Sequence, residues 1–251
     1  MTYRVGLVVP SSNTTMETEI PALLHARSAK TGESFTFHSS RMRMKQVTPE
    51  ELARMDAEST QCAVELTDAH CDVIAYACLV AVMAQGSGAH VRCEGRLGDA
   101  ASGEGRDTPI VSSAGALVTT VRELGLQRVA LIAPYMRPLT AMVVDYLQDE
   151  GIEVTASVSL EIADNVEVGR ISSEVLWDAY QRLDREGADA VILSACVQMP
   201  SLALVERVEA DAGVPVITAA TSTVRQILRR LDLSLDAPGG GSILVDASRS
   251  G

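Results

Sequence analysis

Short apolar runs of strand length alternate along the chain with longer stretches in which apolar residues recur at helical spacing. The clearest strands are expected over residues 3–9, 72–78, 128–133 and 189–196. Each run is almost continuously apolar, which is typical of parallel strands buried on both faces. Because strands that alternate with helices form mostly parallel sheets, the pattern predicts an α/β protein.

Helix boundaries are marked by local capping signals. Thr14 is expected to be the N-cap of the first helix, with Glu17 completing a capping box three positions on. Thr48 followed by Pro49 marks the start of another helix. One uninterrupted helix is expected over residues 166–186.

Two stretches, residues 85–107 and the end of the chain, lack a clear pattern of this kind. Residues 85–107 are rich in Gly, Ala, Ser and charge, which predicts a long surface loop, and residues 86–106 within it suggest no function. Helices are expected from Pro200 and from about Ser222. The end of the chain is expected to be loose, with a possible edge strand over residues 243–245.

The two halves of the chain resemble each other. Residues 4–10, Arg-Val-Gly-Leu-Val-Val-Pro, match residues 128–134, Arg-Val-Ala-Leu-Ile-Ala-Pro. Two of the predicted strands also end alike, in Ala-Cys at Cys78 and Cys196. This repeat predicts two similar lobes related by a pseudo-twofold axis, with a cleft between them. The lobes are expected over residues 1–115 and 116–235, followed by a tail of residues 236–251.

Composition and charge narrow the range of partners. The chain has 251 residues, 47% of them hydrophobic, and a formal net charge of -12, which argues against nucleic acid or an anionic membrane as a partner. No apolar stretch approaches the roughly 18 residues of a membrane span, and no secretory signal is evident. Five cysteines without a CxxC motif favour a reducing cytoplasm, and the four histidines lack metal-ligand spacing.

The two matched cysteines are the leading candidates for chemistry. Ligands of open α/β sheets bind at the carboxyl ends of the strands, where Cys78 and Cys196 are expected. A helix that begins directly after a cysteine lowers its thiol pKa, and its free N–H groups stabilise an anion. A single buried cysteine is usually a small apolar filler. Two at equivalent positions of a repeat favour a functional pair.

Several polar residues are expected near the same cleft. Asn13 and Tyr135 follow equivalent strands of the two halves, and Asn165 begins a predicted helix. Each also has a purely structural interpretation, as a turn residue or as part of a helix start. Arg41 and Arg43 share one face of a strand and are expected to be solvated, although either is placed to meet an anionic ligand.

Three motifs carry a resemblance that covers nearly the whole chain. Residues 8–17, 76–80 and 194–201 resemble the maleate cis-trans isomerase family within the aspartate/glutamate racemase superfamily. Amino-acid racemases usually show Asn-Thr and Thr-His after the two cysteines, where this chain has Leu79-Val80 and Val197-Gln198. Arylmalonate decarboxylase resembles the second half but lacks the first cysteine.

The resemblance implies covalent catalysis that converts maleate to fumarate. The thiolate of Cys78 would add to the alkene, which allows the former double bond to rotate, and elimination would release fumarate. The N–H groups of Leu79, Val80 and Val197 would hold the enediolate. Cys196 would protonate the other carbon or stabilise the intermediate.

The resemblance also implies which residues bind the substrate, that no cofactor is needed, and how the enzyme is assembled. Asn13, Tyr135 and Asn165 would orient the two carboxylates of maleate, the small dicarboxylate substrate. No metal, nicotinamide, flavin or pyridoxal cofactor is required. A homodimer in the cytoplasm is implied, with a role in nicotinate degradation.

Three other interpretations of the residues remain open. The first is a two-cysteine amino-acid or hydantoin racemase, in which the cysteines act as base and acid on opposite faces of one carbon. The second is a non-catalytic, small-molecule-binding module of two lobes, which would give the paired cysteines no role. The third is a redox protein in which Cys78 and Cys196 form a disulfide.

Overall fold

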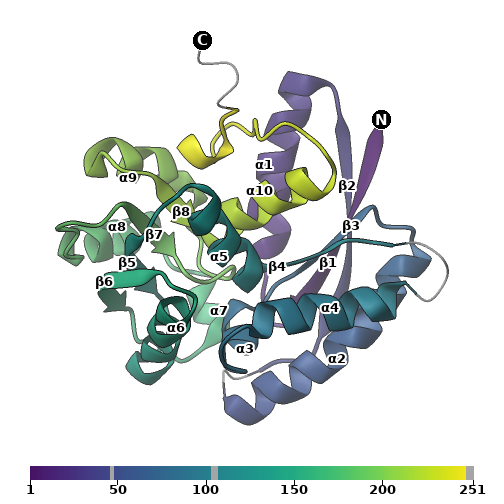
Figure 1. Ribbon diagram of the computed structural model, residues 1–251, viewed down its shortest axis with the longest axis horizontal. Coiled ribbons are helices and arrows are strands. Elements are labelled where there is room, and N and C mark those ends of the chain that lie inside the picture. The colour runs from purple at the N-terminus through teal and green to yellow at the C-terminus, as the bar shows by residue number, and fades with distance from the viewer. Residues whose placement is uncertain (46–47, 103–106, 247–251) are drawn as a thin grey trace.

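Two four-stranded parallel sheets form the frame of the molecule in the computed structural model, which describes residues 1–45, 48–102 and 107–246 (Figure 1). The first sheet has the order β2-β1-β3-β4 and consists of β1 (Thr2–Pro10), β2 (Ser34–Met42), β3 (Val73–Tyr76) and β4 (Ile110–Ser112). The second has the equivalent order β6-β5-β7-β8, from β5 (Arg128–Ala133), β6 (Glu153–Ser159), β7 (Ala190–Ser194) and β8 (Val216–Thr218). The α/β class and the two similar lobes are thereby confirmed.

Helices follow most strands, as expected of parallel sheets. They are α1 (Met16–Thr31), α2 (Pro49–Asp68), α3 (Leu79–Met83), α4 (Ala89–Ala101), α5 (Ser113–Glu123), α6 (Arg137–Asp149), α7 (Asn165–Val168), α8 (Ser173–Arg182), α9 (Val205–Ala212) and α10 (Ala219–Arg230), with short 3-10 turns η1 (Leu202–Leu204) and η2 (Ser242–Leu244). The predicted start of α2 is confirmed, because the Thr48 side chain accepts a hydrogen bond from the N–H of Glu51. Nowhere in the described ranges does a helix have both the length and the apolar character needed to cross a membrane.

The Gly-rich segment is not a long loop, and that prediction was wrong for residues 89–101. These residues form α4, which buries His90, Cys93, Leu97 and Ala101 at helical spacing. Gly86 and Gly88 adopt positive φ angles of 82° and 69° in the turn before α4, a conformation that glycine accepts without strain. Residues 103–106 of the expected loop lie outside the described part of the chain.

Two other helix boundaries differ from the prediction, the first through long-range contacts to Gln198 and the second through local caps. Helix α1 begins at Met16 with Thr15 as N-cap, and no side chain forms the predicted capping box. The stretch 166–186 is interrupted: Asp164 caps α7, and Ser172 caps a separate helix α8.

The end of the chain is packed rather than loose where it is described. Ile243 and Leu244 are buried in the turn η2, so the expected edge strand is absent from residues 243–245. The Arg225 side chain donates a hydrogen bond of 2.6 Å to the carbonyl of Ile243. The helix expected from Pro200 is the turn η1 followed by α9, and the helix expected from Ser222 begins earlier, at Ala219.

Helix α10 joins the two lobes. It packs against α5 and α1 and also contacts β3, β4 and β8, so it touches both sheets. Its residues from Ala219 to Leu228 are all buried. In Figure 1, α10 lies in the middle of the molecule, beside α1 of the first lobe. The predicted boundary between the two lobes near residue 115 stays a prediction. Helix α10, the last helix of the second repeat, completes the packing of the first lobe.

Candidate active site

Both cysteines line one small pocket between the lobes. Cys78 lies two residues after β3 and Cys196 two residues after β7, and each is 8% exposed. All eight sequence-predicted site residues meet there: the pocket is lined by Pro10, Asn13, Met44, Ala77, Cys78, Leu79, Val80, Tyr135, Asn165, Cys196, Val197 and Gln198. The repeat in the sequence therefore predicted which strand ends lie close together.

The pocket is tight and its lining is uncharged. Its volume of about 20 Å³ is close to the minimum that a single water molecule needs. A larger ligand enters only when lining side chains move apart. Within the described residues, the lining offers thiols, amides, a phenol and backbone N–H groups but no charged side chain.

The thiol of Cys78 is not acidic in this closed pocket. Burial raises its pKa to about 12, although the N–H of Ala81 acts in the opposite direction, and Cys196 and Asp56 raise the pKa further. The expected lowering by the following helix is present, through the N–H of Ala81 in α3, but burial outweighs it and the pKa of the thiol is raised overall. Helix α3 has only five residues, and its dipole does not offset the loss of water around the sulfur.

Cys196 has more hydrogen-bond donors around its sulfur. Burial raises the pKa of this thiol, while the hydroxyl of Tyr135 and the N–H groups of Gln198 and Met199 counteract that rise. The carbonyl of Ala195 is the other acceptor within reach of this O–H, at 3.2 Å, so the single proton of Tyr135 is shared between the sulfur and that carbonyl. Burial keeps the pKa of Tyr135 well above its usual value, so its hydroxyl remains a neutral donor.

The two predicted amides are oriented by the protein. Asn13 Oδ1 accepts the N–H of Met16 at 3.0 Å, which leaves its Nδ2 group available to a ligand. Asn165 Nδ2 donates to the Ser12 hydroxyl at 2.8 Å. Arg41 does not line the pocket, but its guanidinium donates to the carbonyl of Asn13 at 2.7 Å and so fixes that loop.

Gln198 also lines the pocket, together with Pro10, Met44 and Ala77, and none of the four was predicted as a site residue. For Gln198 the signal was its position, two residues after the second cysteine. Its side chain is 2% exposed and reaches the first lobe, where Oε1 accepts the N–H of Thr14 at 2.9 Å.

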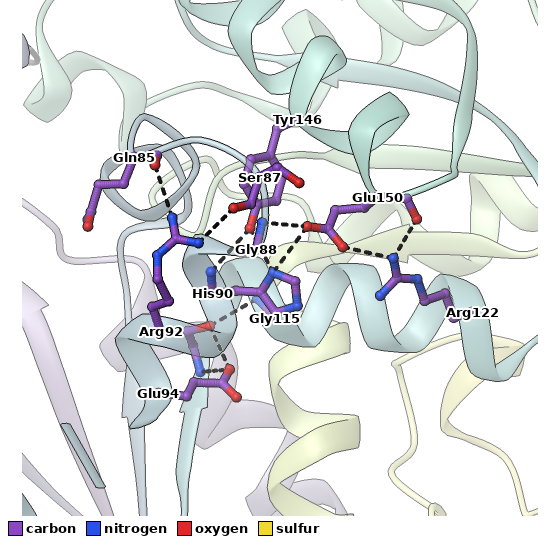
Figure 2. A network of polar contacts seen from close by, with 11 residues as sticks. Gln85, Ser87, Gly88, His90, Arg92, Glu94, Gly115, Arg122, Tyr146 and Glu150 are labelled. Atoms are coloured by element: carbon purple, nitrogen blue, oxygen red, sulfur yellow. Dashed lines mark hydrogen bonds and ion pairs between the residues drawn. The ribbon is translucent and has the colours of Figure 1, made fainter. Parts of the chain in front are cut away.

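A polar network fixes the end of α3 that lies away from Cys78. Figure 2 shows the Arg92 guanidinium donating to the carbonyls of Gln85 at 3.2 Å and Ser87 at 2.8 Å. The N–H of Gly88 donates to the Glu150 carboxylate, one residue beyond α6, at 2.8 Å. These contacts attach the turn after α3 to the second lobe, so the helix that follows the first cysteine is supported from both lobes.

This fold and its two facing cysteines define a two-lobed α/β enzyme with a cysteine-lined pocket between its lobes. The family model described as arylmalonate decarboxylase matches residues 5–244. A maleate isomerase of Geobacillus stearothermophilus is 56% identical over 243 residues, which are 96% of this chain and 97% of that protein. The chain belongs to the arylmalonate decarboxylase family and, within it, to the maleate isomerases.

Solved structures agree in fold over nearly the full length. The maleate isomerase Iso of Pseudomonas putida S16, in a cysteine-to-alanine variant with maleate, is 51% identical with a TM-score of 0.97, covering 98% of this chain and 99% of that one. The Nocardia farcinica maleate cis-trans isomerase, in a cysteine-to-serine variant with a covalently bound succinylcysteine intermediate, is 50% identical with a TM-score of 0.94, covering 97% and 98%.

Proposed function

We propose that this enzyme isomerises maleate to fumarate by reversible addition of a cysteine to the double bond. The observation that carries the proposal is the pair of buried cysteines in one uncharged pocket, at equivalent strand ends of the two lobes. The succinylcysteine in the Nocardia farcinica relative supports the covalent step, because an adduct of that kind forms when a thiol adds to maleate.

The reaction needs the double bond to become single for a time. The reacting form of Cys78 is its thiolate, which bonds to one alkene carbon; the electron pair of the double bond moves toward the carboxylate on the other carbon, which gives an enediolate. Rotation about the new single bond follows. Return of the electron pair expels Cys78 as a thiolate and leaves the trans alkene, so no atom is gained or lost.

Backbone N–H groups are placed to stabilise the charge that develops. Those of Leu79, Val80 and Val197 have no protein acceptor among the hydrogen bonds of the described residues, and all three residues line the pocket. Donors that are fixed before the reaction need no reorganisation when the enediolate forms. We assign them to the intermediate.

The carboxylates are assigned to the neutral donors of the pocket. Asn13 and Tyr135 lie on turns after β1 and β5, Asn165 begins α7, and together they hold a dianion without a buried cation. A neutral lining avoids the cost of burying a cation when the pocket is empty.

The cysteines differ in a way that supports separate roles. Three donors surround the sulfur of Cys196, which favours a hydrogen-bonded thiol or thiolate that stabilises or protonates the intermediate. The sulfur of Cys78 has one backbone donor, from Ala81. Cys78 is the proposed nucleophile because the family resemblance gives that role to the cysteine of the first lobe.

Proton NMR of maleate incubated with the purified enzyme tests the proposal. Fumarate should accumulate with the wild type and with Cys62→Ala, a buried cysteine outside the pocket, and should be absent with Cys78→Ala. Cys196→Ala should turn over slowly and accumulate a covalent adduct whose mass equals one maleic acid. If Cys78→Ala retains wild-type turnover, the assigned nucleophile is wrong. If the wild type leaves maleate unchanged, the proposed reaction is wrong.

The remaining proposals concern the oligomeric state, the metabolic role and the cellular location of the enzyme. We propose a homodimer and a role in nicotinate degradation, both supported by the family resemblance. We propose a cytoplasmic location because all five cysteines are free and buried. Sedimentation equilibrium tests the dimer, and thiol titration of protein isolated from cells tests the reduced state.

A further inference from the structure

The side chain of Gln198 lies where three loops of the pocket meet. Its Oε1 accepts the N–H groups of Thr14 at 2.9 Å and Thr15 at 3.3 Å. Its Nε2 donates to the carbonyls of Ser12 at 3.0 Å and Asn165 at 2.9 Å. Both donors and both acceptor positions of the amide are therefore used.

These bonds connect the groups that are assigned to the substrate. Ser12 and Thr14 are the chain neighbours of Asn13 in the first lobe, whereas Asn165 and Cys196 belong to the second lobe. The Thr15 hydroxyl also donates to the carbonyl of Gln198 at 2.7 Å, which closes the link from the other side. One buried amide thus sets the spacing between the two asparagines and the second cysteine.

We propose that Gln198 is a positioning residue for the isomerisation, which fixes the two asparagine amides relative to Cys196 through its four hydrogen bonds. The inference rests on the proposed function. Gln198 forms no bond to the reacting carbons and acts through the loops that it joins. A neutral amide suits this position, because a carboxylate there would lack the two donors and would repel a dianionic substrate.

Gly169 offers a way to move Gln198 without changing any residue of the pocket lining. A Cβ atom at Gly169 would lie 2.5 Å from Gln198 Nε2 and 3.1 Å from its Cδ, so alanine displaces the amide. Gly169 has an ordinary helical φ of -69°, so alanine introduces no backbone strain. Gly95 in α4 is the matched control, because a Cβ there has nothing within 4 Å.

The test is steady-state kinetics of maleate isomerisation per folded enzyme, with the folded fraction measured by near-UV circular dichroism. Gln198→Ala should raise KM and lower kcat together, with a loss of about 100-fold in kcat/KM, the scale of a misplacement of about 1 Å. Gly169→Ala should shift both constants in the same directions, and Gly95→Ala should match the wild type. A merely structural role would lower the folded fraction and leave KM and kcat per folded enzyme unchanged, which would overturn the inference.

Gln198→Glu adds a pH signature. The introduced carboxylate still accepts from Thr14 and Thr15 but has no proton to donate; once protonated, it can donate to one of the two carbonyls. The ratio of variant to wild-type kcat/KM should therefore rise as the pH is lowered. Carboxyl groups become protonated near and below about pH 5. A ratio that stays constant between pH 8 and about pH 5 would count against the role of the two N–H donors of the Gln198 amide. If the wild type itself failed to isomerise maleate, the proposed function would be at fault instead.

Discussion

The carboxylate of Glu19 is a second link between the lobes, and its substitution gives a quantitative test of the structure. Glu19 lies on α1, is 8% exposed, and accepts the N–H groups of Ser201 at 2.6 Å and Leu202 at 2.7 Å through Oε1. Both donors belong to the segment that follows Cys196. Glu19→Ala leaves two buried N–H groups unpaired, at about 1–3 kcal/mol each, so the free energy of unfolding should fall by roughly 2–6 kcal/mol. Glu19→Gln keeps an oxygen for both donors and should cost much less.

The same carboxyl group predicts how stability depends on pH. Burial raises the pKa of Glu19 above its usual 4.5, against the lowering effect of its bonds to Leu202 and Ser201. The folded state then holds the proton more tightly than the unfolded state. The stabilising contribution of the protonated group is therefore complete below pH 4.5 and is lost as the pH rises through the folded-state pKa. Relative to wild type, Glu19→Gln should gain stability over that interval.

Urea unfolding between pH 4 and about pH 8, followed by circular dichroism, measures both effects. Glu17→Ala is the control, since Glu17 is a partly exposed residue of the same helix whose ion pair with Arg41 is worth at most about 1 kcal/mol. The reasoning is refuted if Glu19→Gln is as destabilised as Glu19→Ala at pH 7. It is equally refuted if the difference between Glu19→Gln and wild type does not grow with pH.

Two further predictions concern the pocket. Tyr135→Phe removes the hydroxyl beside the Cys196 sulfur. It should lower kcat by about 100-fold while the melting temperature changes little. An unchanged kcat would exclude the hydroxyl from the reaction. Because burial raises the pKa of Cys78 to about 12, kcat/KM for maleate should rise between pH 7 and about pH 9, approaching tenfold per pH unit. A flat profile would mean that the nucleophile is already a thiolate in the resting enzyme.

The strand ends and their residues were predictable because they follow from local pattern and repetition. Apolar runs identified β3 and β7, and their common Ala-Cys ending placed Cys78 and Cys196 at one edge. Asn13 and Tyr135 followed from their places in the turns directly after β1 and β5, the equivalent first strands of the two halves. Topology then brought these residues together without further information.

The features that could not be predicted depend on contacts between distant residues. Gln198 binds Thr14 and Thr15 across 184 and 183 positions, and this link replaced the capping box that the sequence suggested. The raised thiol pKa of Cys78 depends on burial by both lobes, which no local pattern records. Helix α4, by contrast, had a visible signal: the spacing from His90 to Cys93 and Leu97 is helical and was obscured by the glycines around it.

The position of α10 makes each half of the chain depend on the other for a complete core. Because this helix of the second repeat packs on α1 and α5, a cut in the linker before β5 would expose apolar surface on both fragments. Neither fragment would carry a complete core, and each would supply one cysteine. Reassociation would restore the core and the pocket in a single event. We therefore expect the two fragments to complement each other, with the formation of fumarate from maleate as the sign that they have associated.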